Sequence, residues 1–162
     1  MNDLENKFNQ LDNNSKKAIN AYRSGREFKI TAEMAYNFKN ILTNGHSTLV
    51  SSIVNASLSC ELFLKSIIMI KKNNEIKIHE LADLYKEIKS ADIDRKLVGY
   101  NIEDELNKIN DSFIKWRYCY ESNSLCIHIS FLFDFCKALE EESRKIILDE
   151  FNIDMNNFFH KN

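Results

Sequence analysis

The chain has 162 residues, which is enough for one domain with a full core but too few for two. Its formal net charge of −2 excludes a general electrostatic attraction to nucleic acid, so any basic surface must be local. With no proline and only three glycines, the chain lacks the residues that break helices and form hairpin turns, and this predicts an all-α fold.

Residues 1–30 are predicted to form an N-terminal helical extension. An apolar stripe at helical spacing runs through residues 3–22, and a polar cluster at residues 12–15 can interrupt it. Residues 23–30, which surround Gly25, are expected to form a connector. The polar, acidic beginning of the chain has none of the features of a secretory signal, which predicts a cytoplasmic protein.

Residues 31–150 are predicted to form the main helical bundle. Its first helix is expected over residues 31–43, with Thr31 as the N-cap and with Met34 and Phe38 on the buried face.

The stretch from Ser47 to Lys72 is the longest apolar region, with apolar residues on most sides of the predicted helix. It contains Asn55, Glu61 and Lys65, and charges at the centre of a bilayer cost several kcal/mol each. We therefore expect the central helix of a soluble bundle and no membrane partner.

Further helices are expected after the central one. A short amphipathic helix has His79 near its start, and the least periodic segment of the chain follows it. Together these elements predict an up-and-down bundle of four long helices plus short accessory helices. The remaining ranges are 76–90 (short helix), 91–102 (irregular), 103–121 and 125–150 (long helices) and 151–162 (C-terminal tail).

Four cysteines lie within apolar helical patterns, with no CxxC pair and no histidine at metal-ligand spacing. In a cytosolic chain such cysteines are mostly small core residues, so neither a metal nor a cofactor is predicted. They are Cys60, Cys119, Cys126 and Cys136.

Two helices each carry a charge pair at i and i+4, which places both charges on one face. The pairs are Glu61 with Lys65 and Arg117 with Glu121, and Tyr118 lies beside the second pair. If the two faces meet, the charges form either a buried network that fixes helix register or a polar groove in which Arg117 and Lys65 bind a phosphate.

His79 and His128 are two further polar contributors. Each is more typical of a structural or hydrogen-bonding residue than of a catalyst. The sequence assigns no catalytic residue.

Three segments in this order resemble the HEPN superfamily, the higher eukaryotes and prokaryotes nucleotide-binding domain. They are SLSCELFLKSIIMIKK (Ser57–Lys72), IHELADLYKEI (Ile78–Ile88) and the aromatic-Arg-Tyr-x-Tyr-Glu segment within FIKWRYCYE (Phe113–Glu121).

The resemblance implies a compact helical bundle, homodimerisation and a role in bacterial conflict systems, such as abortive infection or a toxin–antitoxin pair with a nucleotidyltransferase or antitoxin partner. RNA-cleaving members carry an Arg followed after four to six residues by His. No Arg of this chain has a His at that distance, so the motif does not support catalysis.

The sequence thus predicts a HEPN-like protein associated with a nucleotide or RNA, with phosphate contacts from Lys65 and Arg117 and with His79 nearby. A non-catalytic helical dimerisation or interaction module is the second hypothesis. A metal-independent ribonuclease that uses Arg117 with His79 or His128 is the third.

Overall fold

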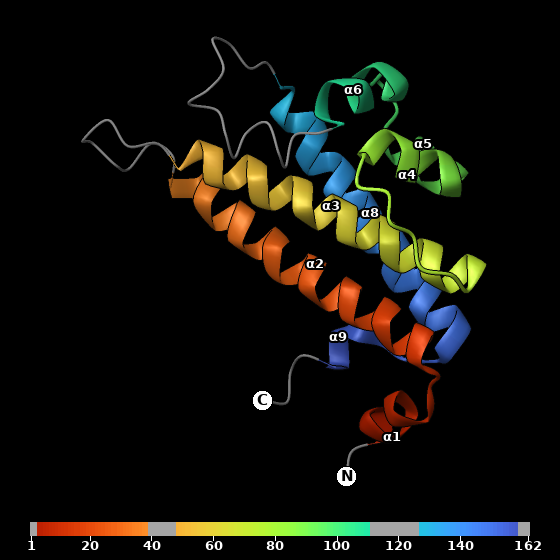
Figure 1. Ribbon diagram of the computed structural model, residues 1–162. Coiled ribbons are helices and arrows are strands. Elements are labelled where there is room, and N and C mark those ends of the chain that lie inside the picture. Colours follow the sequence, from red (N-terminus) through yellow and green to blue (C-terminus); the bar gives the residue numbers. More distant parts are fainter. Residues whose placement is uncertain (1–2, 39–47, 111–126, 159–162) are drawn as a thin grey trace.

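The computed structural model describes residues 3–38, 48–110 and 127–158, and within these ranges it contains helices and no strand (Figure 1). The predicted all-α fold is confirmed. In chain order the helices are α1 (Asp3–Gln10), α2 (Asn13–Phe38), α3 (Leu49–Lys72), α4 (Leu81–Ile88), α5 (Ala91–Lys96), α6 (Ile102–Ile109), α8 (Ile129–Phe151) and α9 (Met155–Phe158).

Three long helices build the core. Figure 1 shows α2 and α3 lying antiparallel side by side along their lengths, while α8 packs against α3 and runs in the same general direction as α3. In an up-and-down bundle, a long helix that runs in the opposite direction must lie between α3 and α8 in the chain. The sequence predicts that helix over residues 103–121. The structure describes α6 in this range, and residues 111–121 lie outside the described part, so the order of four long helices stays a prediction.

The central position predicted for the apolar stretch is confirmed by α3. Although α3 is long and apolar enough to cross a membrane by length and composition, 61% of its apolar stretch is buried inside the protein. Each fully buried large apolar side chain contributes about 1.5–3 kcal/mol relative to an exposed one. The largest ones in the core of the three long helices are Ile19 and Tyr22 from α2, Ile53, Phe63, Leu64, Ile67 and Ile68 from α3, and Phe131 and Phe135 from α8.

Helix α2 passes through Gly25 without a break, so the connector predicted for residues 23–30 is wrong. Gly25 serves close packing instead. A Cβ on Gly25 would lie 3.0 Å from Cε1 of Phe63, and the hydroxyl of Ser59 donates a 2.6 Å hydrogen bond to the Gly25 carbonyl. The missing side chain therefore lets α2 approach α3 closely, and this packing offsets the roughly 1 kcal/mol that glycine costs in a helix.

The face predicted for residues 31–43 is also wrong within its described part. Met34 and Phe38 are 56% and 51% exposed, whereas Ala32 is fully buried. Each residue turns a helix by about 100°, so position 34 lies opposite position 32, which faces α3. Thr31 is not a cap either, because it lies inside α2 and its hydroxyl donates to the carbonyl of Glu27. The predicted division after residue 30 falls within this one continuous helix.

Asp12 lies between α1 and α2, at the interruption predicted for residues 12–15, and caps the beginning of α2. Its carboxylate accepts hydrogen bonds from the backbone N–H groups of Asn14 and Ser15 and from the Ser15 hydroxyl. These bonds, above all the one from the Ser15 hydroxyl, lower the pKa of Asp12.

A layer of short helices, α4 to α6, lies along one side of α3 and α8 (Figure 1). Asn110, directly after α6, caps α4: its carbonyl accepts from the Leu81 N–H at 3.1 Å and its Oδ1 from the Ala82 N–H at 2.7 Å. The predicted irregular segment 91–102 contains one helix, α5, with Ser90 as its N-cap. Between α5 and α6, Gly99 has a φ of +104°, a conformation that residues other than glycine strongly disfavour.

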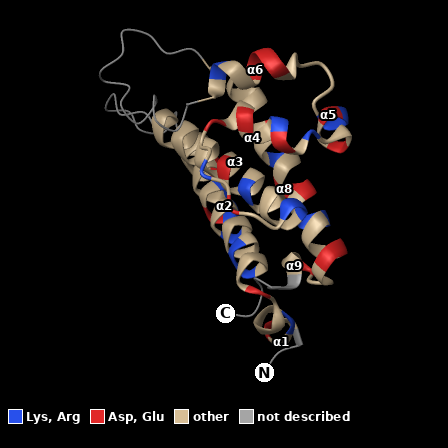
Figure 2. Ribbon diagram, turned by 45° about the vertical axis from the view of Figure 1, so that its right-hand side comes forward, with Lys and Arg blue, Asp and Glu red and all other residues tan. Residues whose placement is uncertain are grey.

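Charges of both signs alternate over the surface of α4, α5 and the second half of α8 (Figure 2). Two ion pairs connect α5 to α8, one between Lys96 and Glu141 at 2.7 Å and one between Asp92 and Lys145 at 2.9 Å. At the opposite end of the molecule, the ammonium of Lys7 in α1 donates to the carbonyl of Asn152, which follows α8. These contacts attach the short helices to the core.

Candidate functional site

Glu61 and Lys65 lie one helical turn apart on α3, as their spacing predicts. The Lys65 ammonium donates to Oε1 of Glu61 at 2.8 Å. The Glu61 side chain is only 8% exposed and that of Lys65 is 16% exposed, so this pair is much better shielded from water than an ordinary surface ion pair. The buried carboxylate is therefore satisfied locally.

His79 provides a second contact to the same carboxylate oxygen. Its Nδ1 lies 2.8 Å from Oε1 of Glu61, and the His79 side chain is 67% exposed. The segment between α3 and α4 brings His79 there, after Asn73 ends α3 in a left-handed conformation with φ +47°. We call Glu61, Lys65 and His79 the α3 cluster.

The contact with Glu61 selects one tautomer of the neutral imidazole. An ionised carboxylate only accepts hydrogen bonds, so Nδ1 of His79 must carry the hydrogen and donate it to Glu61. In the neutral ring, Nε2 then carries a lone pair on the exposed edge, and none of the described residues bonds to it. The ring can accept a proton at Nε2 and then donate from Nε2 to an anion.

Lys65 adds a positive charge beside this ring. Its Nζ lies 3.4 Å from Nδ1 of His79, and only one of its three N–H donors is needed for Glu61. The α3 cluster can therefore act in two ways, as a carboxylate-oriented histidine base or as a donor pair for a phosphate oxygen.

Arg117, Tyr118 and Glu121 lie outside the described residues. The predicted meeting of the two charge pairs, with Lys65 bridging Glu121 and Arg117 bridging Glu61, stays a prediction. In the described part, Lys65 bonds to Glu61 on its own helix.

A second carboxylate–histidine pair joins α6 to the beginning of α8. Oε2 of Glu105 lies 3.4 Å from Nδ1 of His128, and Oε1 accepts from Lys108 at 2.9 Å. The hydrogen bond from Lys108 lowers the pKa of Glu105, burial opposes this, and His128 adds to the lowering. The ring edge of His128 meets Tyr100, with 5.3 Å between ring centroids.

The sequence analysis named His128 but not Glu105. Glu105 is only 9% exposed, although it follows two other acidic residues in the first turn of a short helix. No local spacing relates it to a histidine that follows much later in the chain, so sequence periodicity gives no signal for this pair.

Cys60 and Cys136 are buried in the core, as predicted, and Cys119 and Cys126 lie outside the described residues. Burial raises the pKa of the Cys60 thiol, which keeps it protonated. Within the described ranges, no group of three or more His, Cys, Asp or Glu side chains could hold a metal ion.

No family model, curated protein or solved structure matches the chain. A functional interpretation therefore rests on the contacts described above.

Proposed function

We propose that this chain is a nucleotide-binding helical protein, of the HEPN-like kind that the sequence resembles, and that it contacts a phosphate through His79 and Lys65. The observation that supports this is the single buried oxygen of Glu61, which accepts from both side chains at 2.8 Å. Glu61 orients the imidazole through Nδ1, so that Nε2 can take up a proton together with a phosphate ligand. The exposed edge of the ring then presents a charge-assisted donor beside an ammonium group.

The charges of the α3 cluster limit its affinity for a phosphate. Glu61 neutralises Lys65, so the net positive charge comes from the proton that His79 takes up with the ligand. We expect binding to weaken as salt rises and as pH rises, because both reduce the attraction for a phosphate. Arg117 is the further phosphate contact that the sequence suggests.

An NMR titration tests this proposal with four probes: inorganic phosphate, AMP, a short single-stranded oligoribonucleotide and adenosine. The three phosphate-containing probes should shift the resonances of Lys65 and His79, and adenosine should shift them less. Lys65→Met and His79→Gln should each reduce the response. Lys17→Met is the control, because Lys17 is an exposed lysine in an ion pair on α2.

Two outcomes would overturn the proposal. One is the absence of any shift at the α3 cluster with every phosphate-containing probe. The other is binding that both variants leave unchanged.

A second candidate function is a non-catalytic interaction module that pairs with a second copy of the chain. Ile30, Met34 and Phe38 are 48%, 56% and 51% exposed and lie one turn apart along α2. An apolar stripe on a helix is self-complementary in a two-fold dimer. Light scattering at several concentrations tests this function: the wild type should be dimeric and Met34→Glu monomeric, whereas a monomeric wild type would contradict it.

The remaining expectations from the resemblance belong to the same proposal: a cytoplasmic protein of a bacterial defence or toxin–antitoxin system, with a nucleotidyltransferase or antitoxin partner. A metal-independent ribonuclease would use Arg117 together with His79 or His128. Incubation with labelled RNA in the presence of a chelator tests that possibility, and His79→Gln or His128→Gln should abolish any cleavage.

A further inference from the structure

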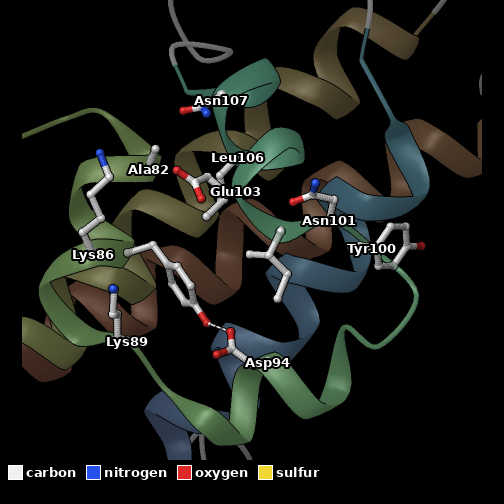
Figure 3. A pocket seen from close by; sticks show the side chains of 11 residues that line it. Ala82, Lys86, Lys89, Asp94, Tyr100, Asn101, Glu103, Leu106 and Asn107 are labelled. Carbon is white, nitrogen blue, oxygen red and sulfur yellow. Dashed lines mark hydrogen bonds between the residues drawn. The ribbon is translucent and has the colours of Figure 1, made fainter.

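A cavity of about 500 Å³ opens between α4, α5 and α6, away from the α3 cluster (Figure 3). Volumes of roughly 300–1,000 Å³ are typical of small-molecule sites. Neither Lys65 nor His79 lines this cavity, so a ligand here would be distinct from the proposed phosphate ligand.

The base of the cavity is apolar and well fixed. Tyr85 and Leu106 line it and are 7% and 4% exposed. The Tyr85 ring packs edge-on against Phe135 with 5.5 Å between centroids, and its hydroxyl donates to Oδ1 of Asp94 at 2.5 Å. Burial raises the pKa of Tyr85 well above its usual range, and the bond to Asp94 raises it further, so the phenol stays neutral. This apolar surface can hold a hydrocarbon or aromatic group.

Positive charge gathers on one side of the cavity. Lys86 and Lys89 both come from the last part of α4, and Figure 3 shows their side chains along the same wall. Lys86 donates to Asp83 at 2.8 Å, which leaves two of its donors. Within the described part of the chain, the Lys89 ammonium has no hydrogen bond or ion pair.

Lys89 also has an unusual backbone. Its φ of +23° is positive, a conformation that residues other than glycine rarely adopt. Its backbone N–H donates to the Tyr85 carbonyl, which holds Lys89 at the end of α4 in this conformation. Such strained positions are common at ligand sites.

Negative charge lies on the other sides. Asp94 comes from α5 and keeps one carboxylate oxygen free of Tyr85, and Glu103 comes from α6. The carboxylate of Glu103 makes no hydrogen bond to the described residues. Figure 3 shows Glu103 above the cavity and Asp94 below it, with the two lysines at its side.

We propose that this cavity binds a small zwitterion, a free amino acid with an apolar or aromatic side chain. A simple anion would meet the two carboxylates, and a simple cation would meet the two ammonium groups. A molecule with both charges and an apolar group matches all three kinds of surface: its carboxylate to Lys86 and Lys89, its ammonium to Asp94, and its side chain to Tyr85 and Leu106.

The test is an NMR titration of the full chain with L-phenylalanine and with two analogues that each lack one charge, 3-phenylpropionate and phenethylamine. L-Phenylalanine should shift resonances of α4, α5 and α6, with a dissociation constant of about 1 mM or lower. Each analogue should bind at least about tenfold more weakly, because one charge-assisted contact is lost.

Two variants locate the site. Lys89→Met removes a positive charge, and Asp94→Asn removes a negative charge while it keeps an acceptor for the Tyr85 hydroxyl. Each should weaken L-phenylalanine binding at least about tenfold, whereas Lys137→Met, at an exposed lysine of α8 that does not line the cavity, should leave it unchanged. The proposal is wrong if L-phenylalanine leaves these helices unshifted, if both analogues bind as tightly as the amino acid, or if neither variant weakens binding.

Discussion

Nδ1 of His79 lies 2.8 Å from Oε1 of Glu61, although the two residues are 18 positions apart in the chain. Glu61 is part of the most buried helix, and His79 lies in the exposed segment that precedes α4. The contact therefore connects the core to the surface, and the carboxylate determines which edge of the imidazole faces the solvent.

The Glu61–Lys65 pair should contribute more to stability than an exposed pair. In a double-mutant cycle of Glu61→Gln and Lys65→Met, we expect a coupling free energy of about 1–3 kcal/mol from urea denaturation, because the carboxylate is shielded from water. The control cycle uses Lys17→Met and Glu75→Gln, a pair that is 60% and 52% exposed. It should give about 0–1 kcal/mol. Equal coupling energies in the two cycles would contradict the structure.

Gly25 should be intolerant of larger side chains. Gly25→Val places a Cβ about 3.0 Å from the fully buried Phe63 ring, and overpacking of this kind costs about 1–3 kcal/mol. Asn20→Val, at an exposed position of the same helix, provides the control for the lower helix propensity of valine. Chemical denaturation should show a clearly larger loss of unfolding free energy for Gly25→Val. If both variants lose the same amount, α2 and α3 do not approach each other as described.

Glu105 should contribute to the loss of stability in acid. Its folded pKa is below the usual value of 4.5, so the unfolded chain binds its proton first as pH falls. The contribution is fully present above pH 4.5 and is lost as pH falls through the folded pKa. Glu105→Gln should therefore flatten the decrease of unfolding free energy below pH 4.5. Glu150→Gln, at an exposed residue with no ion pair to the described part of the chain, should leave the decrease unchanged.

Tyr22 should contribute to the loss of stability at alkaline pH. Burial raises its pKa to about 12 from 10.0, and the charge of Glu140 adds to this. Since the folded state keeps the proton longer, the contribution of Tyr22 is present below pH 10 and is lost as pH rises from 10 through about 12. Tyr22→Phe should lose less unfolding free energy than the wild type over this interval in urea denaturation. Identical slopes for the two proteins would show that Tyr22 is accessible to water.

Periodicity in the sequence was sufficient to predict helices and the contacts between residues of the same helix. The apolar run around α3 indicated the central helix, and the spacing of Glu61 and Lys65 indicated their shared face. Both follow from the 3.6-residue repeat and need no knowledge of the neighbours.

Contacts between elements could not be predicted in this way. Gly25 was interpreted as a helix breaker, whereas its role depends on the Phe63 ring of a neighbouring helix. His79 lies in a segment without periodicity, so nothing in the sequence determines that it folds back on Glu61. The pairing of Glu105 with His128 could not be predicted either, because it depends on how α6 lies against the beginning of α8.

The most direct test of the proposed phosphate site is the protonation of the two ring nitrogens of His79, measured by long-range ¹⁵N–¹H NMR with and without inorganic phosphate. We expect a hydrogen on Nδ1 and none on Nε2 in the neutral ring without phosphate, and the gain of a proton at Nε2 when phosphate is added. A neutral ring protonated at Nε2, or a ring that does not respond to phosphate, would contradict it.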